Sequence, residues 1–260
     1  MHLINYWLII LITMNNILEI KDLRKIYHSI DGEIIAVDNF SFNLKDGEFV
    51  GIVGPSGCGK STILSILCGL DNKSSGSINY LNSNIGYMLQ NDSLFEWRNV
   101  LDNCLLGLEL MNELTCDNKK YVSDLINTYG LSEFAYKYPD SLSGGMRQRV
   151  ALIRTLASRP NILLMDEPFS ALDYQSRLKI SDDIYKILRC EKKSLIMVTH
   201  DIAEAISMCD RVIVLSNRPA TIKSIYDINL VNKSTPINNR SDKNFSKYYE
   251  LIWKDIDSNV

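Results

Sequence analysis

The sequence predicts an α/β fold: a mostly parallel sheet at the core, an antiparallel β subdomain before it, and an α-helical subdomain inserted into it. Three observations support this prediction. Two runs rich in Ile, Val, Leu and Phe flank the turn residues Asp31-Gly32, short apolar strands later alternate with helices, and a stretch of helical segments interrupts that alternation. A chain of 260 residues, 46% of them hydrophobic, can bury such a core.

The first half of the chain predicts two paired strands followed by a strand, a loop and a helix. Residues 17–26 and 34–44 are rich in Ile, Val, Leu and Phe, as expected of antiparallel strands joined by a tight turn. Residues 49–53 form a short apolar strand that runs into a glycine-rich loop, and residues 60–70 have a helical pattern. Residues 80–89 return to a strand-like composition.

The second half predicts the inserted helices and then alternating strands and helices. From about residue 91 to residue 150, helical segments with polar joints replace strands. The alternation that follows favours a largely parallel sheet. The expected elements are a helix at 144–158, a strand at 162–165, a helix at 174–189, strands at 195–198 and 212–215, a polar loop at 232–242 and a final helix at 245–257.

The start of the chain does not have the pattern of a membrane-spanning helix or of a secretory signal. Residues 3–12 are almost wholly apolar, but a spanning helix needs about 20 such residues. A secretory signal has positive charge before its apolar run, whereas the first Lys or Arg here is Lys21. We expect Met14 to be the true start and residues 1–13 to be a non-native or disordered extension; a short membrane-touching tail is the alternative.

Charge and cysteine content exclude two other classes. A formal net charge of −3 gives no electrostatic reason to expect a nucleic-acid partner. The spacing of the six cysteines suits neither a zinc site nor a disulfide scaffold, so we expect reduced thiols that mostly pack as small apolar groups. These cysteines are Cys58, Cys68, Cys104, Cys116, Cys190 and Cys209.

Residues 54–61 read GPSGCGKS and match the phosphate-binding pattern GxxxxGK[ST]. The glycines let backbone N–H groups turn inward around phosphates, and the following helix points its positive end at them. Lys60 is expected to reach the β- and γ-phosphates, and the Ser61 hydroxyl to bind Mg²⁺. The pattern lies between a predicted strand and a predicted helix, so we set aside the alternative of a merely flexible loop. Bulky modification of Cys58, inside this loop, is expected to block ATP binding.

The predicted strand at 162–165 ends in the acidic pair Asp166-Glu167. In a parallel sheet this places two carboxylates at the same edge as the phosphate loop. Asp166 is expected to hold Mg²⁺ or its water, and Glu167 is the candidate general base for the attacking water. Alone, this pattern also describes a strand that meets a solvated turn. Together with residues 54–61 it predicts a P-loop NTPase core.

Residues 142–148, LSGGMRQ, resemble the signature of the ATP-binding cassette (ABC) ATPases. Ser143 and Gly145 lie at a predicted helix start, where a hydroxyl and free N–H groups favour an anion; a simple N-cap is the alternative. Four more features of that family occur along the chain in the expected order. They are Tyr27, Gln90, the SALD segment that ends at Asp173, and His200. The resemblance covers about residues 16–230, which we expect to form one ABC ATPase domain with its helical subdomain at about 91–150, followed by a C-terminal loop and helix at 231–260.

The resemblance implies a role for each of these residues. In ABC ATPases an aromatic at the place of Tyr27 stacks on adenine, the Gln90 amide lies near Mg²⁺ and the permease, and His200 touches the γ-phosphate. Taken singly, Tyr27 could be a sheet residue, Gln90 a surface amide and His200 a helix cap. The implied catalytic residues are Glu167, His200 and Gln90. The implied ATP-binding residues are Tyr27, Gly54, Pro55, Ser56, Gly57, Cys58, Gly59, Lys60, Ser61, Thr62, Ser143, Gly144, Gly145 and Asp173. The implied Mg²⁺ ligands are Ser61, Gln90 and Asp166.

The resemblance also implies partners. In ABC ATPases the signature of one subunit closes over the nucleotide in the P-loop of another, and this chain has one of each. A second ATPase subunit is therefore expected, most simply in a homodimer. The remaining partners implied are an integral-membrane permease and, indirectly, a substrate-binding protein. The expected location is peripheral, on the cytoplasmic face of the cell membrane.

The direction of transport follows from finer resemblances. Residues 136–139, YKYP, resemble importer cassettes, which often carry Tyr-Pro before the signature. Residues 90–103 and 217–219 resemble the nitrate, sulfonate and taurine importer group, although Glu96 stands where that group usually has proline. The implied function is an ATP-hydrolysing importer subunit that couples ATP binding and hydrolysis to uptake of a small solute. Phe95, Trp97 and Val100 are candidates for a groove that receives a permease helix, with core packing as the alternative for Trp97.

The main alternative is a soluble ABC-type ATPase that is not associated with a transporter. Repair types carry a long coiled coil between P-loop and signature, and translation types carry two cassettes in one chain; neither feature is present. A P-loop kinase would have no use for the signature and the switch histidine together. A non-catalytic regulatory cassette would not need Lys60, Asp166, Glu167 and His200 all intact.

Overall fold

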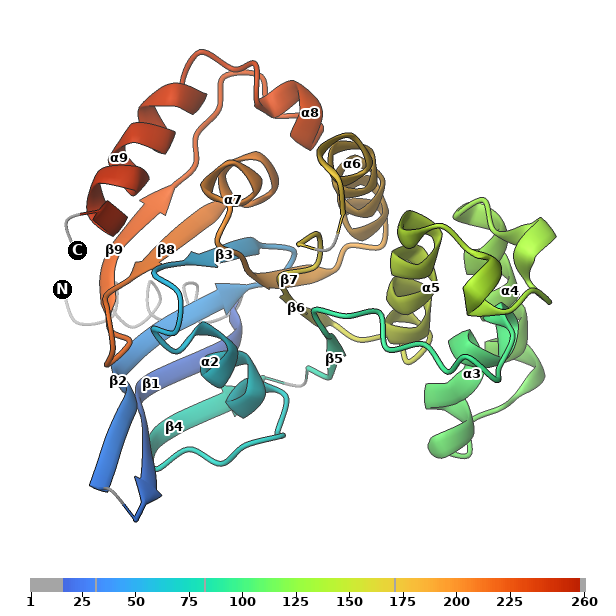
Figure 1. The fold of residues 1–260 in the computed structure, drawn as a ribbon, viewed down its shortest axis with the longest axis horizontal. Coiled ribbons are helices and arrows are strands. Elements are labelled where there is room, and N and C mark those ends of the chain that lie inside the picture. Colours follow the sequence, from blue (N-terminus) through green and yellow to red (C-terminus); the bar gives the residue numbers. More distant parts are fainter. Residues whose placement is uncertain (1–15, 31, 82, 171, 258–260) are drawn as a thin grey trace, which may run out of the picture.

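The computed structural model describes residues 16–30, 32–81, 83–170 and 172–257. Its strands form two sheets, and a lobe of helices extends to one side of them (Figure 1). The predicted extension at residues 1–13 lies outside the described residues. Within the part of the chain that is described, no helix is both long enough and apolar enough to cross a membrane.

The smaller sheet is antiparallel and contains the pair of strands that the sequence predicts. Strands β1 (Asn16–Ser29) and β2 (Gly32–Lys45) pair along their whole length, and β4 (Ser75–Tyr80) pairs with the other edge of β1. Alternate residues such as Leu18 and Phe40 are buried, which is the pattern of a sheet with one face on a core. β4 was not predicted, because nearly all of its side chains are exposed and it lacks an apolar face.

The larger sheet has the strand order β5-β6-β7-β3-β8-β9 and is parallel except for β9, which runs antiparallel to β8 at the edge. Every residue of β3, β6 and β7 is buried, and apart from Asp166 at the end of β6 and Ser194 at the start of β7 they have no polar side chain, as expected of a parallel sheet covered on both faces. The α/β fold class is therefore confirmed. The bounds are β3 (Phe49–Val53), β5 (Ile85–Met88), β6 (Ile162–Asp166), β7 (Ser194–Val198), β8 (Arg211–Leu215) and β9 (Ile222–Asp227).

The single strand predicted at residues 80–89 is wrong. β4 ends at Tyr80 in the antiparallel sheet, whereas β5 begins at Ile85 and pairs in parallel with β6. The chain therefore crosses from one sheet to the other within a stretch that composition alone makes look continuous.

Successive residues of the central strands face two different cores. Val50 and Ile52 pack with the antiparallel sheet and with α2 (Lys60–Leu67) on one side. Phe49 and Val53 pack on the opposite side, with the helices α6 (Tyr174–Cys190), α7 (Ile202–Met208) and α9 (Phe245–Asp257) (Figure 1). This alternation positions the loop after β3 between both cores.

Helix α2 ends three residues before the predicted boundary. Gly69 has φ 79°, the left-handed conformation that ends helices. Its N–H donates to the Ile66 carbonyl, and the N–H of Leu70 donates to the carbonyl of Ser65. These bonds close the helix, and they leave the apolar Leu70 outside it and 71% exposed.

The helical lobe lies between β5 and β6 in the chain. Helix α5 packs against α3 within the lobe and against β5 in the sheet, so it joins the lobe to the core. The elements are α3 (Val100–Leu110), α4 (Cys116–Thr128), the short helices η1 (Ser132–Phe134) and η2 (Pro139–Ser141), and α5 (Gly144–Leu156).

The C-terminal segment packs on the main sheet and its helices. Ile252 of α9 is fully buried. The segment 232–242, predicted to be a loop, includes the short helix α8 (Pro236–Asn239). Proline at its first position has no N–H to lose, and the Asn239 side chain donates to the Ser207 carbonyl and accepts from the N–H of Ser234, which fixes the turn.

Candidate nucleotide-binding and hydrolysis site

The phosphate loop lies at the carboxyl end of β3 and leads directly into α2. Gly57 and Gly59 have φ angles of 71° and 127°, which L-residues with side chains rarely adopt. A Cβ on Gly59 would lie 2.8 Å from the carbonyl oxygen of Ala36, so glycine is also required sterically. The backbone N–H groups at the start of α2 are therefore free to face an anion.

Lys60 is folded back onto its own loop. Its ammonium group donates to the carbonyl oxygens of Gly54 and Pro55, both at 2.8 Å, and the side chain is 7% exposed. The cleft beside it, about 390 Å³ in volume, is lined by Tyr27, Ile34, Ala36, Ser56, Gly57, Gly59, Lys60, Ser61, Thr62, Glu167 and Arg218. A cation, a glycine-rich loop and an exposed aromatic therefore share one hollow.

Asp166 lies at the end of β6, beside Lys60 and Ser61. Burial raises the pKa of its carboxyl, and the neighbouring Glu167 carboxylate adds to the rise, while a hydrogen bond from Ser61 opposes it. One of its oxygens, Oδ1, is buried without a hydrogen-bond partner among the described residues. A buried carboxylate oxygen with no donor is a suitable ligand for a hard cation or its water.

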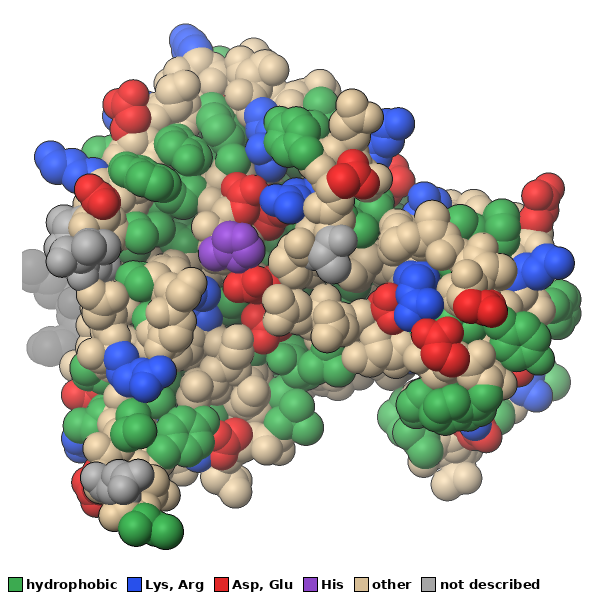
Figure 2. Space-filling model, viewed as in Figure 1, with side chains coloured by type: hydrophobic (Ala, Val, Ile, Leu, Met, Phe, Trp, Pro, Cys, Tyr) green, Lys and Arg blue, Asp and Glu red, His purple; other side chains and the backbone are tan. Residues whose placement is uncertain are grey.

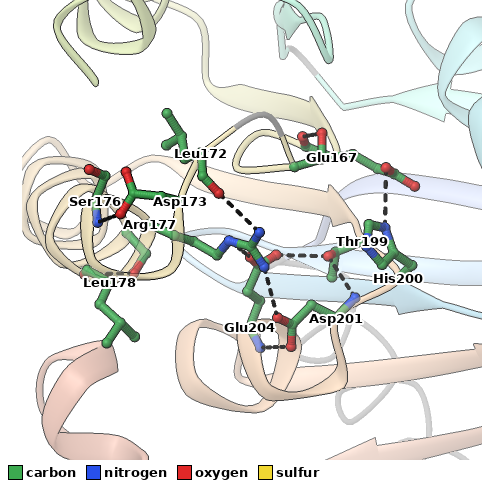
Figure 3. A network of polar contacts seen from close by, with 12 residues as sticks. Glu167, Leu172, Asp173, Ser176, Arg177, Leu178, Thr199, His200, Asp201 and Glu204 are labelled. Atoms are coloured by element: carbon green, nitrogen blue, oxygen red, sulfur yellow. Dashed lines mark hydrogen bonds and ion pairs between the residues drawn. The ribbon is translucent and has the colours of Figure 1, made fainter. Parts of the chain in front are cut away.

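Glu167, Gln90 and His200 meet at the mouth of the cleft. Glu167 Oε2 accepts from Gln90 Nε2 at 3.3 Å and lies 3.2 Å from His200 Nδ1. The backbone of Glu167 has φ 45°, unusual for a residue with a side chain, and its N–H donates to the Val198 carbonyl. Figure 3 shows Glu167 and His200 pointing toward one another from the ends of β6 and β7. The structure therefore brings together the three side chains that the sequence predicts to be catalytic.

The signature residues lie elsewhere. Ser143 caps α5 by accepting from the Met146 N–H at 3.4 Å. A Cβ on Gly145 would lie 2.4 Å from Ile180 Cδ1, so this glycine allows α5 to approach α6. Ser143, Gly144 and Gly145 line a second cavity together with Leu172 and Asp173, and none of these five residues lines the cleft at Lys60. The predicted ATP-binding residues of one chain therefore fall into two groups, one at the phosphate loop and one at the signature, and the two groups line different cavities.

Two further side chains, Tyr27 and Arg218, lie at the cleft beside the phosphate loop, and only Tyr27 was expected there. Tyr27 is 40% exposed at the cleft, and its hydroxyl donates to Asp71 Oδ2 at 2.7 Å. Arg218, which sequence reasoning noted only as part of a subgroup resemblance, lines the same cleft and donates to the Gly57 carbonyl at 2.8 Å. No local pattern identifies Arg218, because the loop that carries it is more than 150 residues from the phosphate loop.

The segment after Gln90 is held by a buried asparagine. Asn103 is fully buried; its Oδ1 accepts from the Phe95 N–H, and its Nδ2 donates to the carbonyls of Phe95, Arg98 and Asn99. Trp97 is 73% exposed and stacks on Phe95, so the alternative of core packing for Trp97 is wrong. Val100 is fully buried in the lobe and therefore cannot line a surface groove.

Glu96, the departure from the subgroup pattern, forms an ion pair. Arg147 of the signature helix donates to Glu96 Oε1 at 2.9 Å and to both oxygens of Asp92. Figure 2 shows some exposed hydrophobic side chains of the lobe beside the notch that separates it from the sheets, and others on the side of the lobe away from the notch.

Comparison with known proteins assigns the family. The family model described as ABC transporter matches residues 37–170. The ABC transporter ATP-binding protein YtlC of Bacillus subtilis, itself uncharacterised, is 41% identical over 93% of this chain and 96% of its own length. The chain belongs to the ABC transporter family. It is an ATP-binding cassette that hydrolyses ATP.

Other relatives and solved cassettes agree with this assignment. The nitrate import ATP-binding protein NrtD of Synechocystis sp. is 40% identical over 90% of this chain and 93% of its own length. The aliphatic sulfonates import ATP-binding protein SsuB 2 of Pseudomonas syringae pv. tomato is 42% identical over 71% of this chain and 77% of its own length. The dimeric cassette MJ0796 bound to ADP and Pi superimposes with a TM-score of 0.69 at 29% identity, over 82% of this chain and 99% of that one. The predictions of family, fold and ATPase activity are confirmed, and the roles of individual site residues stay predictions.

Proposed function

We propose that this chain is the energy-coupling subunit of an importer: it works as a dimer on the cytoplasmic face of the membrane, attached to a separate permease. The proposed dimer is supported by the separation of the two clefts. The cleft at Lys60 has a phosphate loop but no signature, and the cleft at Ser143 has a signature but no phosphate loop. A two-fold dimer would close each cleft with the missing half from the second copy.

Within one site, the residues of this chain divide the work of hydrolysis. Lys60 and the loop N–H groups bind the β- and γ-phosphates of ATP. Ser61, Asp166 and Gln90 would hold Mg²⁺, which would neutralise charge on the phosphates. Glu167 accepts a proton from the attacking water, and His200, 3.2 Å from the Glu167 carboxylate, orients it toward the γ-phosphate. Tyr27, which lines the same cleft, would stack on adenine.

The relatives support a small anionic or sulfur-containing solute as cargo. Those named for import carry nitrate or aliphatic sulfonates, so we place this chain with importers of nitrate, sulfonate or taurine type. A substrate-binding protein would deliver the solute to the permease. Cargo choice itself belongs to those other chains, since nothing in the nucleotide site reads it.

The role of Glu167 is tested by Glu167→Gln. This variant is expected to lose ATP turnover while it still binds ATP and forms an ATP-dependent dimer in size-exclusion chromatography with light scattering. Glu133→Gln, at an exposed residue of η1, is the matched control and should keep wild-type turnover. Unchanged turnover in Glu167→Gln would remove this residue as the base. A variant that binds ATP but stays monomeric would contradict the shared site.

A further inference from the structure

Arg177, in the first turn of α6, contacts three groups that come from different segments (Figure 3). Its guanidinium donates to the Leu172 carbonyl at 3.1 Å and to Asp201 Oδ2 at 3.4 Å, and its Nε lies 3.7 Å from Glu204 Oε1. The fixed fork of an arginine suits such a three-way contact better than a point charge does. One side chain therefore ties the loop before α6 to the loop and helix that follow β7.

Glu204 is the buried end of this contact. It is 3% exposed, and its Oε2 accepts from the hydroxyl of Thr199 at 2.8 Å. The pKa of Glu204 is raised to about 7: burial and then the Asp201 carboxylate raise it, whereas Thr199, Arg177 and the Arg240 guanidinium that follows α8 lower it. A carboxyl this deep in the protein is out of reach of bulk water. It depends on its protein partners for hydrogen bonds, and it therefore fixes the position of those groups.

The residues on either side of His200 are part of this network. Thr199 and Asp201 flank the histidine; the Thr199 hydroxyl donates to Glu204 and accepts from the Asp201 N–H at 3.0 Å. Asp201 also caps α7 by accepting from the Glu204 N–H at 3.1 Å. Both neighbours of His200 are therefore bonded into the group that Arg177 contacts, while His200 itself faces Glu167.

The other end of the network reaches the face where a second cassette is expected. Leu172 lines the signature cleft with Asp173 and Ser143. A Cβ on Gly144 would lie 3.4 Å from the Leu172 side chain, so the loop is packed against the signature. A subunit that docks on this face would press on the loop whose carbonyl Arg177 holds.

The network is also incomplete in a specific way. Arg177 Nε is buried and has no hydrogen-bond partner among the described residues, although Glu204 Oε1 is 3.7 Å away. A movement of less than about 1 Å would bring this pair within hydrogen-bond distance. A buried donor without a partner raises the free energy of the folded protein, so such a movement would lower it.

We propose that Arg177 is a positioning residue that transmits the placement of the Leu172–Asp173 loop to His200, so that docking of a second cassette holds the histidine in its place beside Glu167. This inference rests on the proposed function, in which the second cassette docks at that loop. Arg177 acts through Glu204, Thr199 and Asp201 and does not touch the nucleotide cleft.

The test compares Arg177→Met and Arg177→Lys in steady-state ATP hydrolysis and in binding of a fluorescent ATP analogue. Because small errors in alignment cost about tenfold to a hundredfold in rate, kcat of Arg177→Met should fall in that range, with the Kd for the nucleotide within about twofold of wild type. Arg177→Lys keeps the charge but not the fork and should recover part of the rate. Lys186→Met is the matched control: Lys186 is on the same helix, pairs only with Asp182 in the described structure, and should leave kcat unchanged.

A double-mutant cycle separates positioning from general damage to the fold. In a His200→Ala background, adding Arg177→Met should have little further effect, because the residue through which it acts is gone. An equal loss of kcat in both backgrounds would overturn the proposal, and so would a normal kcat in folded Arg177→Met. If wild type itself fails to hydrolyse ATP, the proposed function fails instead, and the two failures are distinct.

Discussion

Replacing Glu204 by glutamine removes a carboxyl whose proton affinity changes on folding. The pKa is 4.5 for an unperturbed glutamate and rises to about 7 here, first because burial disfavours the charged form and second because Asp201 lies close. The folded-state pKa is the higher one, so the stabilisation is fully present below pH 4.5 and is lost as pH rises through about 7. At 1.36 kcal/mol for each pH unit, the whole effect is about 3 kcal/mol, and most of it falls between pH 5 and pH 8.

Urea unfolding of wild type and Glu204→Gln at pH 5, 6, 7 and 8 measures this effect. The free energy of unfolding of the variant, relative to wild type, should rise by about 2–3 kcal/mol from pH 5 to pH 8, since glutamine does not titrate. Other ionisable groups contribute equally to both proteins and cancel. Parallel pH profiles for the two proteins would refute the argument and would mean that Arg177 and Arg240 keep Glu204 at an ordinary pKa.

Two further predictions concern buried side chains near the cleft and in the lobe. Asn103→Ala removes the side-chain partner of the Phe95 N–H and of the Arg98 carbonyl, while the Phe95 and Asn99 carbonyls keep backbone donors, so it should lower the free energy of unfolding by about 2–4 kcal/mol in urea titration. Asn127→Ala, at an exposed position, should cost less than about 0.5 kcal/mol, and a similar small loss for Asn103→Ala would contradict the account. Burial also raises the pKa of the Cys58 thiol, so timed alkylation followed by mass spectrometry should label exposed Cys116 at least about tenfold faster; equal rates would count against a buried thiol.

The parts of the fold that sequence predicts well are those in which local pattern and tertiary environment agree. β3 and β6 are continuous apolar runs because both faces of the central sheet are covered, and such runs stand out in the sequence. β4 was not predicted from the sequence, since an exposed edge strand has no apolar periodicity. The end of α2 was predictable from Gly69, but the apolar Leu70 beyond it extends the helical pattern past the true boundary.

The residues of the site also fall into those that a local sequence pattern identifies and those that only the folded structure brings together. The residues in short motifs, such as Lys60, Asp166 and Glu167, were named from the sequence, because a glycine pattern or an acidic strand end is local. The contacts of Arg177 and Glu204 were not, because isolated charged residues on helices usually face solvent. Only the folded structure shows that Arg177 Nε lies 3.7 Å from Glu204 Oε1.

The central claim, that this cassette drives a membrane importer, is tested most directly by its partners. The chain would be tagged, purified gently from the membranes of its own cells, and the proteins recovered with it identified by mass spectrometry. The account predicts a multi-helix permease together with this chain, and a substrate-binding protein associated with that permease. Recovery of the chain only from the soluble fraction, with ribosomes, with DNA or with no partner, would contradict the importer and leave an ABC-type ATPase of another kind.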